Sequence, residues 1–319
     1  MEKCMEKTKF QYAANIAAFS VALFLTLSMA FKYAIGFILK LLVPGASLAN
    51  PVGMPVWAAA FISMVYTFTV LAIPIVFVRK MQTAAMPVKV KLGKIPRLQG
   101  TKIAAVFFLC YSAASFVSGG LRLLLQKLIN YPAAQGAQLP KGGVAFLLAF
   151  ITMCVLPAFM EEYLFRGLLQ GMLVPWGQRF AIVTVSVLFT LSHSDMSQMP
   201  TIFISSYLLG YAAVCTGGLR LSVVLHFMNN LFAFLAAYAQ QNLDAASALL
   251  LLSVVFTLYI GGGLLALWYL RAEKLPRLQA VKVPQNRQSR FELMATAPVC
   301  AFSFIIAAAY AVLRSFILL

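Results

Sequence analysis

Residues 143–171, GVAFLLAFITMCVLPAFMEEYLFRGLLQG, join a long apolar run to two adjacent glutamates and an arginine. The run from Gly142 to Met160 contains no Lys, Arg, Asp, Glu or His, and about 20 apolar residues are enough for a helix to cross the hydrocarbon core of a bilayer. An ionised side chain near the bilayer centre costs roughly 2.5–3.5 kcal/mol on insertion scales, so such groups mark functional positions. This stretch therefore predicts a transmembrane helix that carries charged residues for a purpose.

The whole chain has the composition of a polytopic membrane protein. Its 319 residues are 62% hydrophobic and 10% charged, and the mean hydropathy is +0.89. We expect one all-α membrane domain over residues 1–319, a transmembrane helical bundle of eight or nine spans. The count depends on 201–216, which is short enough to be only half inserted. The expected spans are roughly 12–31, 57–78, 103–125, 143–170, 180–198, 201–216, 221–240, 246–270 and 295–317.

The net charge of +17 comes from basic residues that lie between the apolar runs. The loop 79–102 holds seven basic residues and no acid, and the loop 271–292 holds six against two acids. Short loops with this bias stay in the cytoplasm, where they meet anionic lipid headgroups. The pattern predicts that both loops and the lysine-bearing N-terminus are cytoplasmic and that 41–56 lies outside. We also expect the first span to be a retained anchor and not a cleaved signal peptide. Because the basic residues lie between apolar runs, nucleic acid is not expected to be a partner.

The acidic residues Glu161 and Glu162 have different local surroundings. Glu162 and Arg166 are four residues apart, so on a helix they share a face and can form an ion pair. Glu161 lies about 100° round the helix and has no local partner, as a general base or acid requires. The alternative is that all three residues form a purely structural polar cluster that holds helices together. Gly167 and Gly171 predict the close approach of a neighbouring helix.

The two histidines of the chain both lie in expected spans. His193 ends FTLSH, with Phe189 one turn before it on the same face, and His226 begins HFMNN, with Asn230 one turn after it. A single histidine in a membrane helix commonly makes an interhelical hydrogen bond. Two histidines, an amide and Glu161 on three consecutive expected helices instead favour one shared site.

Three motifs in this order resemble those of a known family. EEYLFR, FTLSH and HFMNN resemble the E-E-x-x-x-R, F-x-x-x-H and H-x-x-x-N motifs of the CPBP family, intramembrane proteases that include CAAX prenyl endopeptidases and bacteriocin-processing or immunity proteins. The likeness covers about 157–232, and we expect a CPBP-like catalytic core over 143–240. The resemblance implies three pairs of roles. Glu161 and His193 activate a water, His226 and Asn230 stabilise the oxyanion, and Glu162 and Arg166 support the site.

The use of a metal is left open by the residues. Glu161, His193 and His226 would also suit a catalytic zinc ion with an open fourth position, although the H-E-x-x-H arrangement is absent from the sequence. The five cysteines occur singly and do not form a zinc or disulfide framework. We expect a metal-free glutamate mechanism, with zinc as the alternative. Asp195, two residues after His193, is expected to cap that helix or to orient the histidine.

The expected function is hydrolysis of a peptide bond in a membrane-associated peptide or protein. Prenylated CAAX-type proteins and leader peptides are the substrates that the resemblance implies. A non-catalytic immunity or scaffold protein is one alternative. A proton-coupled transporter is another, in which Glu161, His193 and His226 would line a proton path. The absence of a convincing inverted repeat in the sequence argues against transport.

Overall fold

The computed structural model describes residues 2–43, 54–83, 87–131, 139–193, 195–279 and 290–317. Within these ranges the secondary structure is helical, without a strand, so the expected all-α class is confirmed. Most of the connection 41–56, and the basic residues Lys282 and Arg287, lie outside the described residues. The helices are α1 (Glu2–Leu42), α2 (Val56–Met81), α3 (Arg97–Ile129), α4 (Gly143–Phe150), α5 (Leu156–Glu161), α6 (Gln170–Leu173), α7 (Gln178–His193), α8 (Met199–Thr216), α9 (Arg220–Asn242), α10 (Ala245–Tyr269), α11 (Arg290–Ala295) and α12 (Pro298–Ile317).

Seven helical segments in the described part of the chain are long and apolar enough to cross a membrane. The expected count of eight or nine is therefore not confirmed. Helix α7 has 16 residues, which is about 24 Å of helix, and the apolar segment Pro298–Tyr310 of α12 is shorter still. The seven segments are Lys7–Leu42, Val56–Met81, Arg97–Ile129, Gly143–Trp176, Met196–Thr216, Arg220–Asn242 and Ala245–Tyr269.

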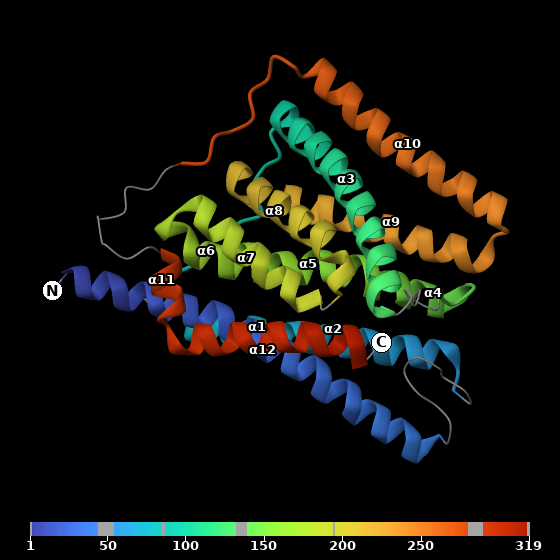
Figure 1. Cartoon of the computed structure of the whole chain (residues 1–319), viewed down its shortest axis with the longest axis horizontal. Coiled ribbons are helices and arrows are strands. Elements are labelled where there is room, and N and C mark those ends of the chain that lie inside the picture. Colours follow the sequence, from blue (N-terminus) through green and yellow to red (C-terminus); the bar gives the residue numbers. More distant parts are fainter. Residues whose placement is uncertain are drawn as a thin grey trace.

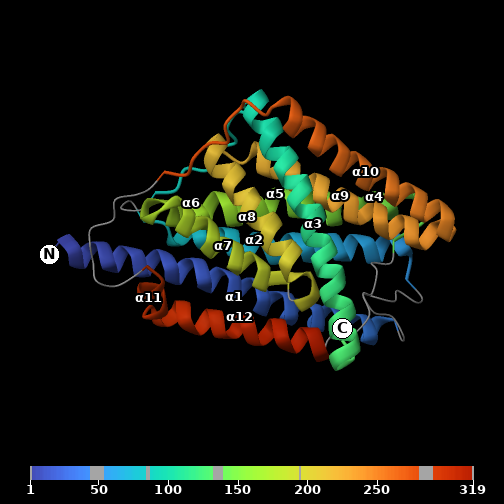
Figure 2. The same cartoon turned by 45° about the horizontal axis from the view of Figure 1, so that its top comes forward.

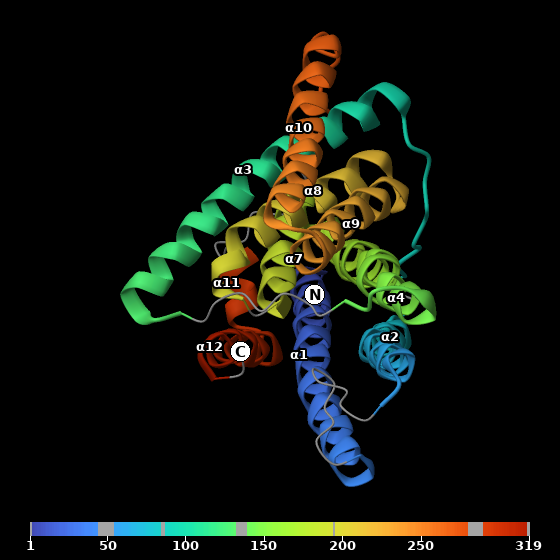
Figure 3. The ribbon, with the colours of Figure 1, turned by 90° about the vertical axis from the view of Figure 1, so that its right-hand side faces the viewer.

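The helices are arranged in layers (Figures 1 and 3). Helix α1 packs along α2 and α12 on one side, and α7, α8 and α9 form the middle of the bundle. Helix α3 runs diagonally across α8 and packs with α10, which lies farthest from α1 (Figure 2). The largest buried apolar cluster joins α1 to α7 through residues such as Phe10, Leu164 and Phe189. The middle helices are thus enclosed from both sides.

The helical segment that carries the glutamates departs from α-helical geometry in three places. Ile151–Val155 and Glu162–Leu169 are π-helical, and Val174–Trp176 is a 3₁₀ turn. Pro157 has no N–H to bond the carbonyl four residues before it, which accounts for the first π-helical stretch. In the second, the N–H of Gln170 bonds the carbonyl of Phe165, five residues back. π-Helical geometry within α-helices is frequent at functional sites.

The close contact at Gly167 and Gly171 is made by an extended segment, and the expectation of a neighbouring helix there was wrong. A Cβ atom on Gly167 would lie 3.0 Å from Cγ1 of Val90, and one on Gly171 would lie 2.7 Å from Cγ1 of Val88. Both valines belong to the basic connection between α2 and α3. This connection therefore packs directly against the helix that carries the glutamates.

The connections that carry most of the basic residues meet at one end of the bundle, here named the basic end. The N–H of Leu219 donates to the carbonyl of Lys91 at 3.0 Å, and the N–H of Gln279 donates to Oε1 of Gln178 at 2.7 Å. The N-terminal part of α1 lies there too, because Tyr12 Oη donates to the carbonyl of Met81 at 2.8 Å. Helices α1, α3, α7 and α9 run away from this end and finish at the opposite one, here named the distal end.

Candidate active site

Three charged or titratable side chains from the CPBP-like motifs are in direct contact inside the bundle. Nδ1 of His226 lies 2.8 Å from Oε1 of Glu162, and Nη1 of Arg166 lies 2.9 Å from the same oxygen. The N–H bonds of Nη1 are not aimed at that oxygen, so the contact with Arg166 is an ion pair without hydrogen-bond geometry. Glu162 is 0% exposed, and Arg166 and His226 are each 4% exposed. This cluster therefore depends on its internal partners for stabilisation.

Glu161 faces the other nitrogen of the same imidazole. Its Oε2 lies 3.9 Å from Nε2 of His226, beyond direct hydrogen-bond distance. Oε2 of Glu161 and Oε2 of Glu162 are both buried and accept no hydrogen bond from the described residues. The sequence interpretation paired Glu162 with Arg166 alone and aimed only Glu161 at the histidines. In the structure His226 lies between the two glutamates, one at each ring nitrogen, so that part of the interpretation needs correction.

His193 is the last residue of α7 and is exposed. Its Nδ1 lies 2.9 Å from the carbonyl oxygen of Phe189. Because a carbonyl oxygen only accepts, Nδ1 carries the proton and Nε2 of a neutral His193 keeps its lone pair. The orientation of the ring thus leaves a proton acceptor at the end of α7.

Phe189 connects the parts of this cluster. Its ring centroid lies 4.5 Å from that of His193 and 6.0 Å from that of His226, and the guanidinium carbon of Arg166 lies 4.3 Å from its centroid. The cation over the ring face adds an electrostatic attraction to the packing. The sequence placed Phe189 on the face of His193 but did not indicate that it also contacts the other two residues.

Two further residues lie near the cluster without joining it. Asn230 is half-buried one turn after His226 on α9, and its Oδ1 lies 3.5 Å from Nδ2 of Asn229. Asp195 accepts a hydrogen bond from the N–H of Ser197 at 3.0 Å and so caps the short 3₁₀ helix Met196–Gln198. Asp195 also pairs with Arg122 of α3 at 2.7 Å. Asp195 therefore caps the 3₁₀ helix that follows it and not α7, the helix that the sequence expectation assigned to it.

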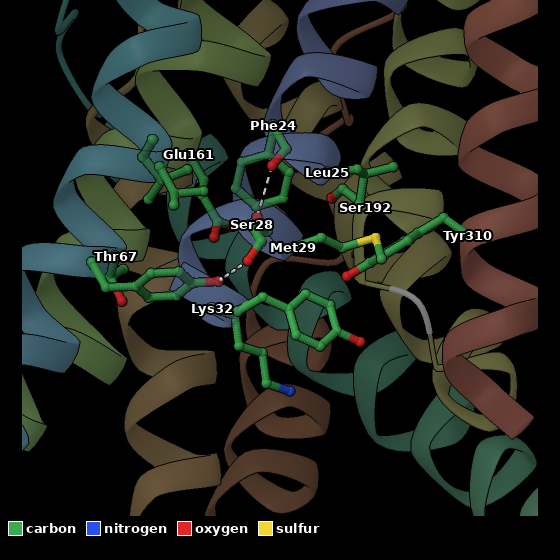
Figure 4. A pocket seen from close by; sticks show the side chains of 13 residues that line it. Phe24, Leu25, Ser28, Met29, Lys32, Thr67, Glu161, Ser192 and Tyr310 are labelled. Atoms are coloured by element: carbon green, nitrogen blue, oxygen red, sulfur yellow. Dashed lines mark hydrogen bonds between the residues drawn. The ribbon is translucent and has the colours of Figure 1, made fainter. Parts of the chain in front are cut away.

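Glu161 also reaches a cavity of about 330 Å³ between α1, α2, α7 and α12 (Figure 4). Much of the wall is apolar and comes from helices outside the three motifs. No pattern in the sequence pointed to these helices as part of the site. The lining residues are Phe24, Leu25, Ser28, Met29, Lys32, Tyr33, Tyr66, Thr67, Val70, Leu71, Glu161, Ser192 and Tyr310.

The described residues do not assemble a site for a metal ion. Among them, no group of three His, Cys, Asp or Glu side chains is close enough to share one. Nδ1 of His226 is held by Glu162, which leaves only Nε2 of that ring to face Glu161. The alternative zinc set of Glu161, His193 and His226 is therefore not formed in this arrangement, and a metal-free reaction stays a prediction.

The residues of this cluster lie within one stretch of family similarity. Residues 143–232 match the family model described as Type II CAAX prenyl endopeptidase Rce1-like. The match supports membership of the CPBP/CAAX protease family for this stretch. The Rce1-like domain begins with α4, ends within α9 and contains all six predicted site residues. Helices α1, α2, α10 and α12 lie outside it. No curated protein and no solved structure matches the chain.

Proposed function

We propose that this protein is an intramembrane endopeptidase that hydrolyses a peptide bond of a membrane-associated peptide or protein. The observation that supports this most strongly is the position of Glu161 within the Rce1-like domain, between Nε2 of His226 and the cavity. Peptide hydrolysis needs a base for the water, a donor for the oxyanion and a proton for the leaving amine. The residues around Glu161 are of types that supply all three.

The charge balance of the cluster suggests the protonation state of His226. Glu161 and Glu162 contribute two negative charges and Arg166 one positive charge, so a protonated His226 makes the formal sum zero. An uncompensated charge in the interior is costly, which favours this neutral arrangement. Nδ1–H of the imidazolium then donates to Glu162, and Nε2–H is available to an oxygen of the substrate.

The proposed reaction uses a water beside Glu161. The two acceptors, Oε2 of Glu161 and Nε2 of His193, orient the water, and its oxygen attacks the peptide carbonyl carbon while one proton passes to Glu161. Nε2–H of His226 and the Nδ2 amide of Asn230 donate to the oxyanion that forms. When the C–N bond breaks, the proton on Glu161 passes to the leaving nitrogen. Glu162 and Arg166 hold His226 in the required orientation.

The Glu161→Gln variant tests the proposal because it keeps the shape of the side chain and removes the base. We expect cleavage to fall by about 10²- to 10⁴-fold, the usual contribution of a positioned acid or base. The membrane peptidomes of cells that carry the wild type and the variant identify peptides that depend on Glu161. Cleavage of one such peptide is then measured with purified protein. Glu273→Gln, at the basic end, is the matched control, and wild-type cleavage by Glu161→Gln would contradict the mechanism.

Two features of the bundle extend the proposal to substrate and orientation. The apolar wall of the cavity suits a substrate that is already held at the membrane, such as a prenylated CAAX-type protein or a leader peptide. The concentration of basic residues at one end of the bundle suits a cytoplasmic position in contact with anionic headgroups.

A further inference from the structure

The cavity beside Glu161 contains a lysine that the hydrolytic reaction does not require. Among the described residues that line the cavity, Lys32 of α1 is the one cation and Glu161 the one carboxylate. The other lining side chains are apolar, aromatic or hydroxyl-bearing. Figure 4 shows Lys32 and Glu161 on the same cavity, contributed by different helices. A substrate in this cavity would therefore meet opposite charges in two places.

Lys32 has no acidic partner among the described residues: Glu161, Glu162 and Asp195 form their ion pairs with His226, Arg166 and Arg122. It follows the run Phe10–Phe31, which is free of charged residues. An unpaired cation beside an apolar cavity is available to a ligand, and an ammonium group binds carboxylates. Lys40, about two turns further along α1, is also exposed but does not line the cavity.

We propose that Lys32 is a specificity-determining residue that binds a carboxylate of the substrate. This inference rests on the proposed hydrolase function. Repulsion by Glu161 keeps an anion away from the reacting end of the cavity, so the carboxylate lies at Lys32 while apolar side chains occupy the wall between them. Lys32 and Glu161 line one cavity of about 330 Å³, and an extended peptide advances about 3.4 Å per residue, so the carboxylate belongs to a residue close to the scissile bond. It is either the carboxyl terminus of the peptide or the side chain of an Asp or Glu.

The test measures binding and not turnover. The full-length Glu161→Gln protein is placed in nanodiscs and titrated with three dansyl-labelled peptides, with empty nanodiscs as the reference. The probes are Ala-Val-Leu-Leu as the free acid, the same peptide as its amide, and Ala-Val-Asp-Leu amide. Fluorescence anisotropy gives the dissociation constants. We expect at least one of the two carboxylate peptides to bind about tenfold more tightly than the plain amide, as a charged hydrogen bond implies. The one that does so identifies the source of the carboxylate.

Variants locate this preference on Lys32. In the same background Lys32→Gln should abolish the preference, Lys32→Arg should keep it, and Lys40→Gln should leave it unchanged. Thr67→Trp, which fills the cavity from α2, should weaken binding of every peptide that binds. Equal binding of acid and amide peptides, no binding of any of them, or a preference that survives Lys32→Gln would overturn the inference. Failure of the hydrolase proposal is recognised separately, in the cleavage assay and not in the binding assay: no peptide would then be cleaved in a way that depends on Glu161.

Discussion

Oε1 of Glu162 and Nδ1 of His226 lie 2.8 Å apart in the interior of the bundle, and this contact ties α9 to the π-helical segment Glu162–Leu169. The same oxygen lies 2.9 Å from Nη1 of Arg166. A carboxylate that accepts from Nδ1 sets the orientation of the ring and directs Nε2 away from itself. Glu162 is thus a positioning residue for the nitrogen that faces Glu161.

This arrangement predicts that Glu162→Gln destabilises the protein more than Glu161→Gln does. The change leaves the Arg166 charge buried without its closest carboxylate, and breaking one partner of a buried pair costs about 3–5 kcal/mol. Thermal unfolding of the purified protein, followed by intrinsic fluorescence, measures the difference.

A double variant separates the charge from the packing. Glu162→Leu combined with Arg166→Leu removes both charges, so it should unfold at a higher temperature than Glu162→Leu alone. A Glu162→Gln protein as stable as the wild type would show that the ion pair does not stabilise the bundle.

Phe189 gives a second prediction, because one ring contacts His193, His226 and Arg166. Phe189→Leu should lower, by tenfold or more, the cleavage of a peptide whose cleavage depends on Glu161. The rings of both histidines lose the surface that positions them, and misplacement of catalytic groups by about 1 Å can lower the rate about 100-fold. Phe180→Leu is the matched control, because Phe180 is also buried on α7 but contacts Phe10 and Phe291. Equal losses in the two variants would show that only general packing is affected.

The helical class and the pairing of Glu162 with Arg166 could be predicted because both depend on local information. Apolar runs indicate spans directly, and residues four apart meet on one helix whatever surrounds them. The partnership of Glu162 with His226 spans 64 residues of sequence and depends on how α9 packs against the π-helical segment. No local spacing contains that relationship.

The wall of the cavity was unpredictable for a related reason. Helices α1, α2 and α12 carry no motif, and their contribution to the site arises from packing between distant segments. In the same way, the small residues Gly167 and Gly171 indicated a close approach correctly, but side-chain size alone does not tell a helix from the extended segment that carries Val88 and Val90.

The distribution of basic residues predicts which end of the bundle faces the cytoplasm. In a variant that lacks the native cysteines, Lys94→Cys reports on the basic end and Lys141→Cys on the distal end; both lysines are exposed. We expect a membrane-impermeant maleimide to label intact cells at position 141 and not at 94, and to label both positions after permeabilisation. The reverse pattern would place the basic end outside. In the expected orientation the last turn of α7, which contains Ser192, lies in the outer half of the membrane. Because Ser192 lines the cavity, that side of the cavity lies there too.

Asp195 predicts a pH-dependent contribution to stability at the distal end. Burial raises the pKa of this carboxyl, but the hydrogen bond from Ser197 and the charge of Arg122 outweigh it, and the pKa lies below its ordinary value. Tyr131 Oη also donates to it, at 3.0 Å. Because the folded-state pKa is depressed, the stabilisation is present above the unfolded pKa of about 3.9 and is lost as the pH falls through the folded value.

Asp195→Asn should therefore lower the unfolding temperature at pH 7, and the gap to the wild type should narrow as the pH falls below about 4. The ionised carboxylate of Asp195 accepts hydrogen bonds from Arg122 of α3 and from Ser197 in the connection between α7 and α8. Loss of one charged hydrogen bond costs about 1.5–3 kcal/mol at neutral pH. Asp244→Asn is the control, since Asp244 is an exposed cap of α10 and asparagine caps a helix about as well as aspartate. A gap for Asp195→Asn that stays constant between pH 7 and pH 3 would show that its effect comes from the altered shape of the cap and not from the charge.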